Sequence, residues 1–331
     1  MSTLLVVGLG LLGLALLTVG ADQAVVGASR LATLLRVAPV IVGVVVIGLG
    51  TSAPEFVVSG TAAVRDNAGL ALGNLVGSNI LNVTLVLGVV AVVSPVMVRS
   101  SVPVREAPLM AAAVAVFGAF ALVGLKFVAG LLLAVLSVGA LALLVRLSRV
   151  QDGDPLPEDV AAFVSPVRAR RWWVFWSPGP RRWWVEALRT VAGLAATLGG
   201  AQLLVDNAVT LAHRWGVSDQ VIGFTLVAFG TSLPELMTSV QAQRRGEGDL
   251  LVGNLLGSNI FNSLIGGAVV GLAAGSSTIA PFGFAAVTAM VFAAVLAWLL
   301  LWRGSRITRP EACVLLAAYV CVLPLLISAN P

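Results

Sequence analysis

The amino-acid sequence predicts an all-α integral membrane protein with ten transmembrane helices arranged as two inverted five-helix repeats. Two observations lead to this prediction. Of the 331 residues, 59% are hydrophobic and only 11% are charged, which is more apolar surface than a soluble domain could bury. A stretch that places one glutamate inside an apolar run also occurs twice, as GLGTSAPEFVVSG at 48–60 and AFGTSLPELMTSV at 228–240. The two glutamates, Glu55 and Glu235, take the same position in their copies.

Apolar runs long enough to cross a bilayer, about 20 residues each, recur from one end of the chain to the other. The first run is expected to remain as a span, because no Lys or Arg precedes it and a signal peptide needs a basic leading segment. We expect ten spans in all. They lie near Leu4–Val19, Val37–Ala63, Gly69–Val96, Ala107–Val123, Phe127–Leu147, Glu186–Leu211, Val217–Gln241, Leu250–Ala273, Phe282–Trp302 and Ala312–Ile327.

The runs divide into two sets of five, which we interpret as two repeats of a single transport domain. Residues 1–147 hold the first set, residues 186–331 hold the second, and a loop at 148–185 joins them. An odd number of crossings makes the second set start on the opposite side of the membrane, so the repeats are inverted. The similarity extends upstream, where Asp22-Gln23-Ala24 resembles Asp206-Asn207-Ala208. Inverted repeats with interrupted helices are typical of secondary transporters.

Basic residues predict the orientation of the chain. If Met1 faces outside, 17 of the 20 Lys and Arg residues lie in cytoplasmic segments, and only Arg65, Lys126 and Arg214 lie outside. The positive-inside rule therefore predicts a multi-pass protein of the cell inner (plasma) membrane, with both termini outside and the 148–185 loop in the cytoplasm. Topology explains the net charge of +5, so no nucleic-acid partner is expected. The expected unit is a monomer.

The central loop ends in clusters of Arg and Trp between residues 168 and 184. Two interpretations remain open: an aromatic belt beside the spans, or a segment that lies on the anionic inner leaflet and responds to membrane lipids. His213, the only histidine, is expected at the outer end of the sixth span, as an interface residue or a pH sensor. Cys313 and Cys321 share one predicted helix at a separation of about 12 Å, which is too far for a disulfide.

Each copy of the repeated stretch carries a proline and a glycine that interrupt a helix. Pro54 cannot donate a backbone hydrogen bond, so the carbonyl of Gly50 loses its helical partner and the turn opens. Pro234 and Gly230 do the same in the second copy. Free carbonyls inside a bilayer are tolerated only where protein, water or an ion satisfies them, so we expect the broken helices to line a cavity.

Polar side chains follow one helix face at and beyond each break. A second element, GNLVGSNILN at 73–82, follows the first glutamate and recurs at the same spacing as GNLLGSNIFN at 253–262. At i, i+4 and i+8 spacing, each copy offers two stripes of oxygen ligands. The stripes are Thr51, Glu55, Ser59 and Asn74, Ser78, Asn82 in the first copy, and Thr231, Glu235, Ser239 and Asn254, Ser258, Asn262 in the second. Glycines four residues apart, Gly73 and Gly77 in the first copy and Gly253 and Gly257 in the second, let helices approach closely.

The predicted ligands suit a hard cation. Two carboxylates and two freed carbonyls supply about six oxygens, and Ca²⁺ takes about 6 to 8 in flexible geometry, whereas Mg²⁺ demands tighter packing. The hydroxyls of Thr51, Thr231, Ser78 and Ser258 could hold Na⁺ in overlapping or adjacent sites. The set contains no soft ligand, which disfavours zinc and copper.

A purely structural role, an enzyme and a channel fit the buried glutamates less well. Acids that merely join helices would each cost roughly 2.5 to 3.5 kcal/mol or more, and Ser, Thr or Asn can do the same with less penalty. An intramembrane enzyme could use the two acids as acid and base, but no GxSxG, HExxH or nearby His accompanies them. A channel would conduct without a counter-ion gradient. We therefore expect a secondary active transporter, not an enzyme, without an organic cofactor.

GTSAPE with GNLVGSNILN, and GTSLPE with GNLLGSNIFN, resemble the two α-repeats of the sodium/calcium exchanger family within the calcium:cation antiporter superfamily. The resemblance, to a prokaryotic member, covers nearly the whole chain. It implies that Glu55 and Glu235 bind Ca²⁺ together with the backbone carbonyls of Thr51 and Thr231. It also implies that the first and sixth spans slide against an eight-helix core. Further residues would form cation sites in which Na⁺ competes with or flanks Ca²⁺: Ser52, Ser78, Asn82, Ser232, Ser258 and Asn262.

Two sequence differences within this superfamily bear on the coupling ion. Some microbial exchangers and the potassium-dependent branch have Asp where this chain has Asn262, and a neutral amide weakens the case for K⁺ co-transport. Proton-coupled calcium exchangers typically show a Gly-Asn-Ala-Thr-Glu-like motif in place of GTSAPE. We therefore expect Ca²⁺/Na⁺ antiport by alternating access at one site, where only a neutralised pair of glutamates passes the apolar seals. The alternative is a Ca²⁺/H⁺ antiporter in which the same glutamates carry protons.

Overall fold

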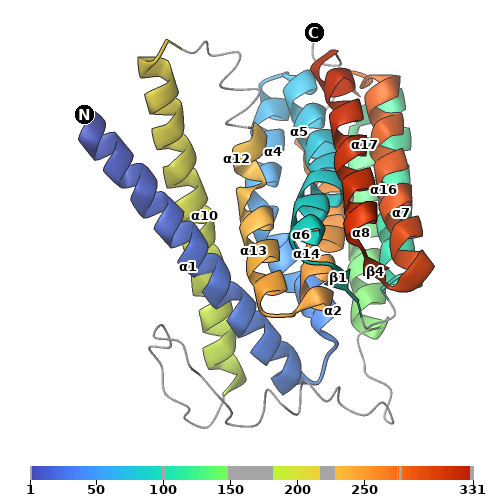
Figure 1. Cartoon of the computed structure of the whole chain (residues 1–331). Coiled ribbons are helices and arrows are strands. Elements are labelled where there is room, and N and C mark those ends of the chain that lie inside the picture. Colours follow the sequence, from blue (N-terminus) through green and yellow to red (C-terminus); the bar gives the residue numbers. More distant parts are fainter. Residues whose placement is uncertain are drawn as a thin grey trace.

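The computed structural model describes residues 2–98, 102–147, 182–216, 228–273, 275 and 278–328, which are almost entirely helical (Figure 1). Seven helices in these ranges are long and apolar enough to cross a bilayer, and an eighth span results if the bent pair Pro39–Thr51 and Ala53–Val64 counts as one. The prediction of a helical, multi-pass membrane protein is therefore confirmed.

Helices in the first half correspond to the predicted runs, with one difference in length. The first run was expected to end at Val19, but the first helix is 33 residues long and continues through the polar pair Asp22 and Gln23 to Leu35. The elements are α1 (Thr3–Leu35), α2 (Pro39–Val42), the π-helix η1 (Gly43–Gly48), α3 (Leu49–Thr51), α4 (Ala53–Val64), α5 (Ala68–Leu81), the π-helix η2 (Asn82–Val86), α6 (Leu87–Val93), α7 (Glu106–Val123) and α8 (Phe127–Leu147).

The second half follows the same order. Residues 217–227 of the predicted run Val217–Gln241 and residues 148–181 of the central loop lie outside the described residues. The elements are α10 (Trp183–Arg214), α12 (Ala228–Thr231), α13 (Leu233–Arg244), α14 (Gly248–Phe261), the π-helix η4 (Asn262–Gly266), α15 (Gly267–Ala273), α16 (Phe284–Gly304) and α17 (Arg309–Ser328).

Two short antiparallel strand pairs join the halves near the helix ends. β1 (Val96–Met97) pairs with β4 (Arg306–Ile307), and β2 (Leu125–Lys126) pairs with β3 (Thr278–Ile279). Each pair satisfies backbone groups that the helices leave free, which matters where little water is available.

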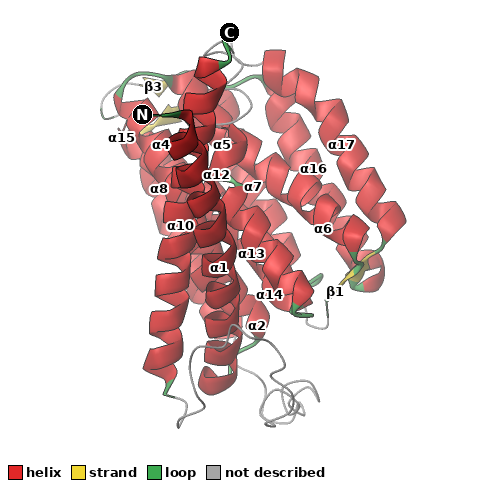
Figure 2. Ribbon diagram, turned by 60° about the vertical axis from the view of Figure 1, so that its left-hand side comes forward, coloured by secondary structure: helices red, strands yellow, loops and turns green. Residues whose placement is uncertain are grey.

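The two longest helices, α1 and α10, lie side by side along one flank of the bundle (Figures 1 and 2). Their backbones touch through glycines spaced seven residues apart. A Cβ atom on Gly20 would lie 2.6 Å from the backbone nitrogen of Thr197, and one on Gly200 would overlap the backbone nitrogen of Leu17. This close packing supports α1 beyond its most apolar part, which explains why the helix outlasts the predicted run.

The centre of the bundle is formed by α5 and α14, whose predicted copies share the second repeated element. Both helices are mostly buried, and each continues through a π-helix into a second α-helical segment, α6 or α15. The two segments that carry the buried glutamates, α4 and α13, pack directly against α5 and α14. The repeated motifs therefore meet in the middle of the molecule.

Candidate cation-binding site

Each glutamate stands in the first turn of a helix that begins at a break. Ser52 separates α3 from α4 with φ −81° and ψ 1°, and Ser232 separates α12 from α13 with φ −93° and ψ 4°. These angles lie in the bridge region between helix and strand, so both breaks share one backbone conformation. In the first copy the axis bends by 43°. Pro54 and Pro234 follow within the first two positions of their helices. The backbone N–H groups of a first turn have no acceptor within the helix, so a proline there breaks no helical hydrogen bond.

The two carboxylates are fully buried and lie close enough to repel each other. Glu235 Oε1 accepts hydrogen bonds from the hydroxyls of Ser52, at 3.2 Å, and Ser258, at 3.4 Å. The hydroxyls of Ser78 and Thr231 lie beside the Glu55 carboxylate, and the hydroxyl of Thr51 lies beside that of Glu235. Each acid is thus flanked by the threonine of the other copy, so the two halves build one site.

Asn74 and Asn254 hold the glutamate-bearing helices in place. Nδ2 of Asn74 donates to the backbone carbonyl of Glu55 at 3.2 Å and to Ser59 Oγ at 2.9 Å. Nδ2 of Asn254 makes the matching contacts to the Glu235 carbonyl at 3.5 Å and Ser239 Oγ at 3.3 Å, with a further one to Thr238 Oγ1 at 3.0 Å. Both amides therefore support the broken helices.

The other predicted asparagines begin two of the three π-helices in the described part of the chain. η2 starts at Asn82 and η4 at Asn262, and both side chains are buried. π-Helical turns inside α-helices occur frequently at functional sites because they change the direction of side chains. Nothing in the apolar pattern of the sequence signals the extra residue in these turns, so the π-helices were not predicted. Neither was the amide network that Asn79 and Asn259 add between α5 and α14.

Several buried oxygens at this centre have no hydrogen-bond partner within the described residues. They belong to both halves and to each of the two repeated elements. They are Oε1 and Oε2 of Glu55, Oε2 of Glu235, Oγ of Ser232, and Oδ1 of Asn82 and Asn262. Buried polar atoms normally have a hydrogen-bond partner, and hard cations take oxygen ligands. This set of oxygens therefore fits the ligands of a hard cation. The described residues hold no group of three or more His, Cys, Asp or Glu that could hold a metal ion, so a cation at this centre would depend on hydroxyl, amide and carbonyl oxygens beside the two acids.

Close backbone contacts fix the first broken helix against α14. A Cβ on Gly253 would overlap the carbonyl oxygen of Val40, and a Cβ on Gly257 would lie 2.6 Å from the Cα of Val44. From the opposite side, a Cβ on Gly43 would lie 2.5 Å from the carbonyl oxygen of Leu250. The close approach predicted from the glycine spacing is present in the second copy, but at Gly77 in the first copy no described atom lies within 4 Å of a Cβ.

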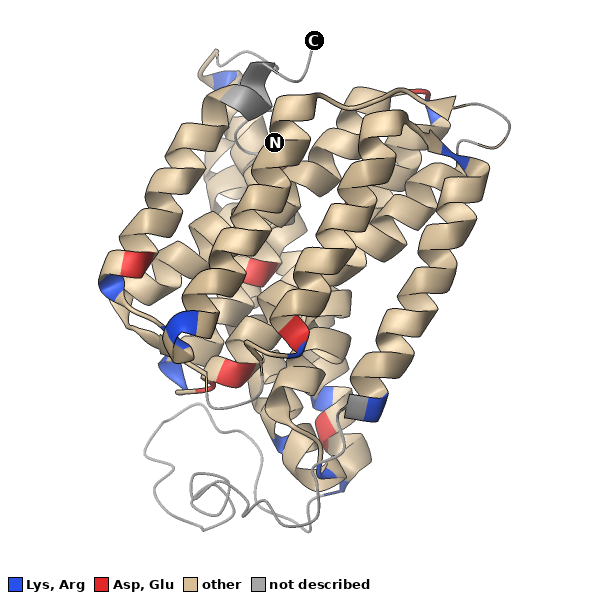
Figure 3. Cartoon of the chain, turned by 90° about the vertical axis from the view of Figure 1, so that its right-hand side faces the viewer, with Lys and Arg blue, Asp and Glu red and all other residues tan. Residues whose placement is uncertain are grey.

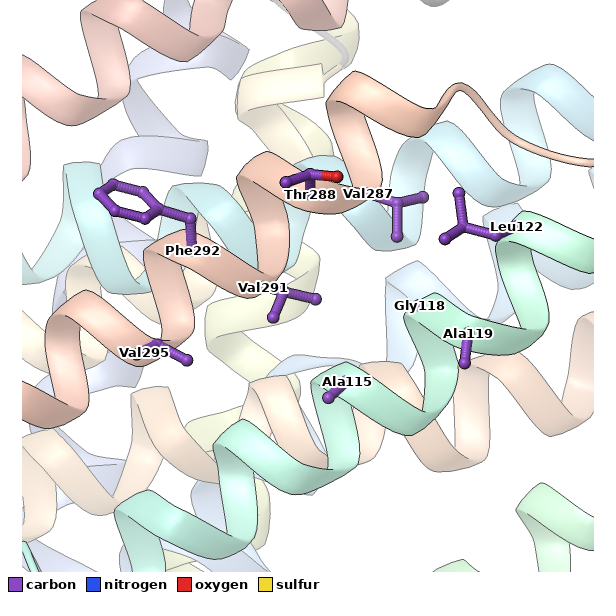
Figure 4. A pocket seen from close by; sticks show the side chains of 9 residues that line it. All are labelled: Ala115, Gly118, Ala119, Leu122, Val287, Thr288, Val291, Phe292 and Val295. Carbon is purple, nitrogen blue, oxygen red and sulfur yellow. The ribbon is translucent and has the colours of Figure 1, made fainter.

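The distribution of charged residues and the lining of one groove do not indicate a second ion site in the described part of the chain. Charged residues of the described chain gather toward the helix ends, with some acidic positions as the exceptions inside the bundle (Figure 3). A groove of about 510 Å³ opens between α7 and α16 (Figure 4), but its lining is apolar. The hydroxyl of Thr288 in that lining already donates to the carbonyl of Phe284. We do not assign the groove to ions.

Two broken helices that bury paired acids at the centre of a multi-pass bundle define a membrane ion transporter rather than an enzyme. The comparisons with known proteins are more specific. A family model described as sodium/calcium exchanger protein matches residues 5–150 and 186–328. The chain belongs to the sodium/calcium exchanger family, whose members are secondary transporters.

Relatives resemble the chain over almost its full length. The sodium/calcium exchanger MaX1 of Methanosarcina acetivorans is 30% identical, over 96% of this chain and 97% of that protein. The inner membrane protein YrbG of Escherichia coli is 34% identical, over 91% and 90%. The solved structure of the sodium-calcium exchanger NCX_Mj, soaked with zero Na⁺ and Ca²⁺, has a TM-score of 0.81 at 32% identity and covers 98% of this chain and 100% of that one.

Proposed function

We propose that this protein is a secondary active antiporter that exchanges Ca²⁺ for Na⁺ by alternating access at a central site built from Glu55 and Glu235. One observation carries the proposal. The two acids come from different halves, are fully buried and lie close enough for their charges to interact, and three of their four carboxylate oxygens have no hydrogen-bond partner in the described chain. Two such charges in an apolar interior require a neutralising ligand. A Ca²⁺ ion, or a set of Na⁺ ions, supplies that charge.

The proposed architecture has ten spans in two inverted repeats, residues 1–147 and 186–331, joined by the 148–185 loop. The support is the matched local structure: both breaks share one backbone conformation, and both π-helices begin at the last residue of the second repeated element. Breaks and π-helices at the same positions in two halves are expected when one ancestral fold has been duplicated.

In the proposed site, Ca²⁺ lies between the carboxylates and takes further oxygens from the backbone carbonyls of Thr51 and Thr231. Na⁺ ions use the surrounding hydroxyl and amide oxygens. These belong to Ser52, Ser78, Asn82, Ser232, Ser258 and Asn262. Because Ca²⁺ and Na⁺ share the two acids, loading one cation excludes the other, which is what obligatory exchange needs.

The proposed orientation places both termini outside and the 148–185 loop in the cytoplasm of a cell whose inner (plasma) membrane holds the protein. Lys and Arg support this because most of them lie at the end of the bundle opposite the two termini (Figure 3). We expect a monomer, surrounded by membrane lipids.

Purified protein in liposomes tests the proposal through ⁴⁵Ca²⁺ uptake driven by an outward Na⁺ gradient. Glu55→Gln and Glu235→Gln should each abolish uptake, because the amide removes one charge from the shared cation site. Glu106→Gln is a matched control, since Glu106 is also a buried acid whose carboxylate has no hydrogen-bond partner in the described chain, but it lies at the start of α7. Full exchange by either site variant would refute the assignment.

A Ca²⁺/H⁺ antiporter is the second candidate, because unpaired buried carboxylates can also carry protons. Imposing Na⁺, H⁺ and K⁺ gradients separately distinguishes the two. Uptake that follows the pH gradient in the absence of Na⁺ would select the proton mechanism.

A further inference from the structure

The amide groups of Asn82 and Asn259 meet where α5 runs into η2 beside α14. Nδ2 of Asn82 donates to Oδ1 of Asn259 across 3.1 Å, and Nδ2 of Asn259 donates to the backbone carbonyl of Asn79 across 2.9 Å. All three residues are buried. Asn82 is a proposed cation ligand, whereas Asn259 lies outside the proposed ligand set.

The carbonyl of Asn79 determines how both amides are turned. A carbonyl oxygen can only accept, so Nδ2 of Asn259 must face it and Oδ1 of Asn259 must face Asn82. Asn82 in turn has to present its own Nδ2 to that oxygen. Its Oδ1 is then left buried without a partner in the described chain.

We propose that Asn259 is a positioning residue that keeps the oxygen, rather than the nitrogen, of the Asn82 amide available to a cation. The proposal rests on the proposed function, since it takes Asn82 to be a ligand of transported Na⁺. Asn82 lies one helical turn beyond Ser78, whose hydroxyl stands beside the Glu55 carboxylate. With the amide rotated by half a turn, two N–H groups would face the cation and oppose its binding.

A double-mutant cycle in liposomes tests the positioning role. Asn259→Leu should raise the Na⁺ concentration that half-saturates ⁴⁵Ca²⁺ exchange by about tenfold, the effect of one lost neutral hydrogen bond. The half-saturating Ca²⁺ concentration should stay within about twofold, because the carboxylates dominate Ca²⁺ binding. If Asn259 acts through Asn82, the variant N82A/N259L should be no worse than N82A alone.

The opposite results are equally clear. Parallel loss of Na⁺ and Ca²⁺ affinity, or additive effects in the double variant, would show a packing role and overturn the proposal. If the unmodified protein gives no Na⁺-driven uptake, the proposed function fails. If it does and N259L is silent, only the positioning role fails.

A separate observation concerns the ends of the molecule. Oδ1 of Asp22 on α1 accepts hydrogen bonds from Nε of Arg245 at 3.0 Å and from Nη2 at 2.5 Å, just beyond the end of α13. Further along α1, Ser29 donates to Glu247 at 2.5 Å. Residues 24–29 between and beside these contacts are all buried. At this end, therefore, α1 is held against the core.

The second copy carries the same residue types without the pairing. Asp206 matches Asp22, and Arg65 takes the position in the first copy that Arg245 takes in the second. Asp206 is exposed and accepts from its neighbour Gln202, and exposed Arg65 forms no ion pair with any described residue. Residues 208–213, which match 24–29, are partly or fully exposed. Figure 1 shows this part of α10 standing away from α4.

We infer that Asp22–Arg245 and Asp206–Arg65 are alternating latches, of which the first is closed in this structure and the second closes when the site opens at the other end. Inverted repeats exchange their conformations when access alternates, so a contact made by one copy passes to the other. The side chains of Asp22 and Arg245 are 30% and 32% exposed. Such an ion pair is weak enough to form and break in every cycle.

Crosslinking tests the latches independently of which ion drives transport. In a chain with Cys313 and Cys321 changed to Ser, the variants D22C/R245C and D206C/R65C are treated in membranes with a reducible thiol crosslinker about as long as an arginine side chain. The control D22C/R65C joins one residue from each end. We expect both matched pairs to crosslink, with yields that change in opposite directions when Na⁺ or Ca²⁺ is added, and each crosslink to block uptake until it is reduced. The control should not crosslink.

Failure of D206C/R65C to crosslink under any ionic condition, while D22C/R245C does so, would overturn the second latch. Absence of the D22C/R245C product in every condition would overturn the first. Equal yields for matched and control pairs would show nonspecific reaction and would also sink the inference.

Discussion

The two copies of the repeated element agree at their centre. Asn74 and Asn254 make the same pair of contacts to a glutamate carbonyl and a serine hydroxyl. Both breaks adopt the same backbone angles, and both second elements end in a π-helix. Local sequence determines these features, so they repeat wherever the motif repeats.

At their edges the copies differ. Gly257 has the backbone of Val44 against it, whereas at the matched Gly77 no atom of the described residues lies within 4 Å of a Cβ. Arg245 is paired with Asp22, and Arg65 is exposed. These features depend on where whole helices pack, and under the proposed alternating access that packing differs between the two ends of the molecule. Residues at the centre therefore reflect the chemistry of the candidate site, whereas residues at the edges reflect how the helices pack in this conformation.

The largest expected effect breaks the agreement at the centre. Glu55→Gln should raise the melting temperature in ion-free detergent more than Glu235→Gln does, because within the described residues two hydroxyls donate to the Glu235 carboxylate at hydrogen-bond distance, whereas those beside Glu55 make no bond that short. A buried acceptor without a hydrogen bond costs about 1 to 3 kcal/mol, and more when it is charged. Both variants should lose the stabilisation by Ca²⁺, which reaches about 2.7 kcal/mol at a hundredfold excess over Kd.

Thermal unfolding with and without Ca²⁺ measures both quantities. Wild-type stabilisation by Ca²⁺ in either variant would show that the acids do not hold the ion. A larger rise in melting temperature for Glu235→Gln than for Glu55→Gln would show that the two hydroxyl donors do not stabilise the charge of Glu235.

Gly257→Ala and Gly77→Ala sharpen the contrast at the edges. The new Cβ at 257 would stand 2.6 Å from both Cα and O of Val44, so η1 must move away from α14. Overpacking of this kind costs about 1 to 3 kcal/mol. At 77 no described atom lies within 4 Å of the new Cβ. Alanine in a helix is favoured over glycine by up to about 1 kcal/mol.

The melting temperature should therefore fall for Gly257→Ala and hold or rise for Gly77→Ala. Equal losses at both positions would contradict the asymmetry of packing between the two copies.

Sequence reasoning reached the parts of the site that depend on local pattern. The constant offset between the copies, the prolines and the i, i+4 spacing determine which helix face carries Glu55 and Ser59, because helical geometry is local. The apolar pattern failed for α1, whose predicted end at Val19 is too early. Asp22 and Gln23 end the apolar run, yet the helix continues because α10 and Arg245 support it, and those are contacts across the whole chain.

Features set by tertiary packing were beyond such reasoning. The π-helices at Asn82 and Asn262 add a residue to a turn without changing composition. The orientation of the Asn259 amide follows from a carbonyl of another helix. The unequal burial of residues 24–29 and 208–213 depends on how α1 and α10 pack against the rest of the bundle, which two matching sequences do not specify.

A smaller effect is expected at the amides that support the broken helices. Asn254→Ala removes four hydrogen bonds from a fully buried side chain, including the one that Oδ1 accepts from Thr51, and Asn74→Ala removes two from a partly exposed one. Unpaired buried groups cost about 1 to 3 kcal/mol, so Asn254→Ala should lower unfolding free energy more than Asn74→Ala. Thermal unfolding in one detergent measures the difference, and a reversed order would show that the two supports are not built alike.

The smallest effect belongs to the latch itself. Asp22→Asn removes the charge from a pair that is about one-third exposed, so the loss of stability should be below about 1 kcal/mol and should shrink as salt screens the pair. Asp206→Asn is the matched control, because Asp206 forms no ion pair with the described residues in this state. Melting temperatures at low and high ionic strength should therefore separate Asp22→Asn from the unmodified protein only at low salt, and should not separate Asp206→Asn at either. A salt-independent loss for Asp22→Asn would assign its role to packing along α1, because screening acts on charge and leaves packing unchanged.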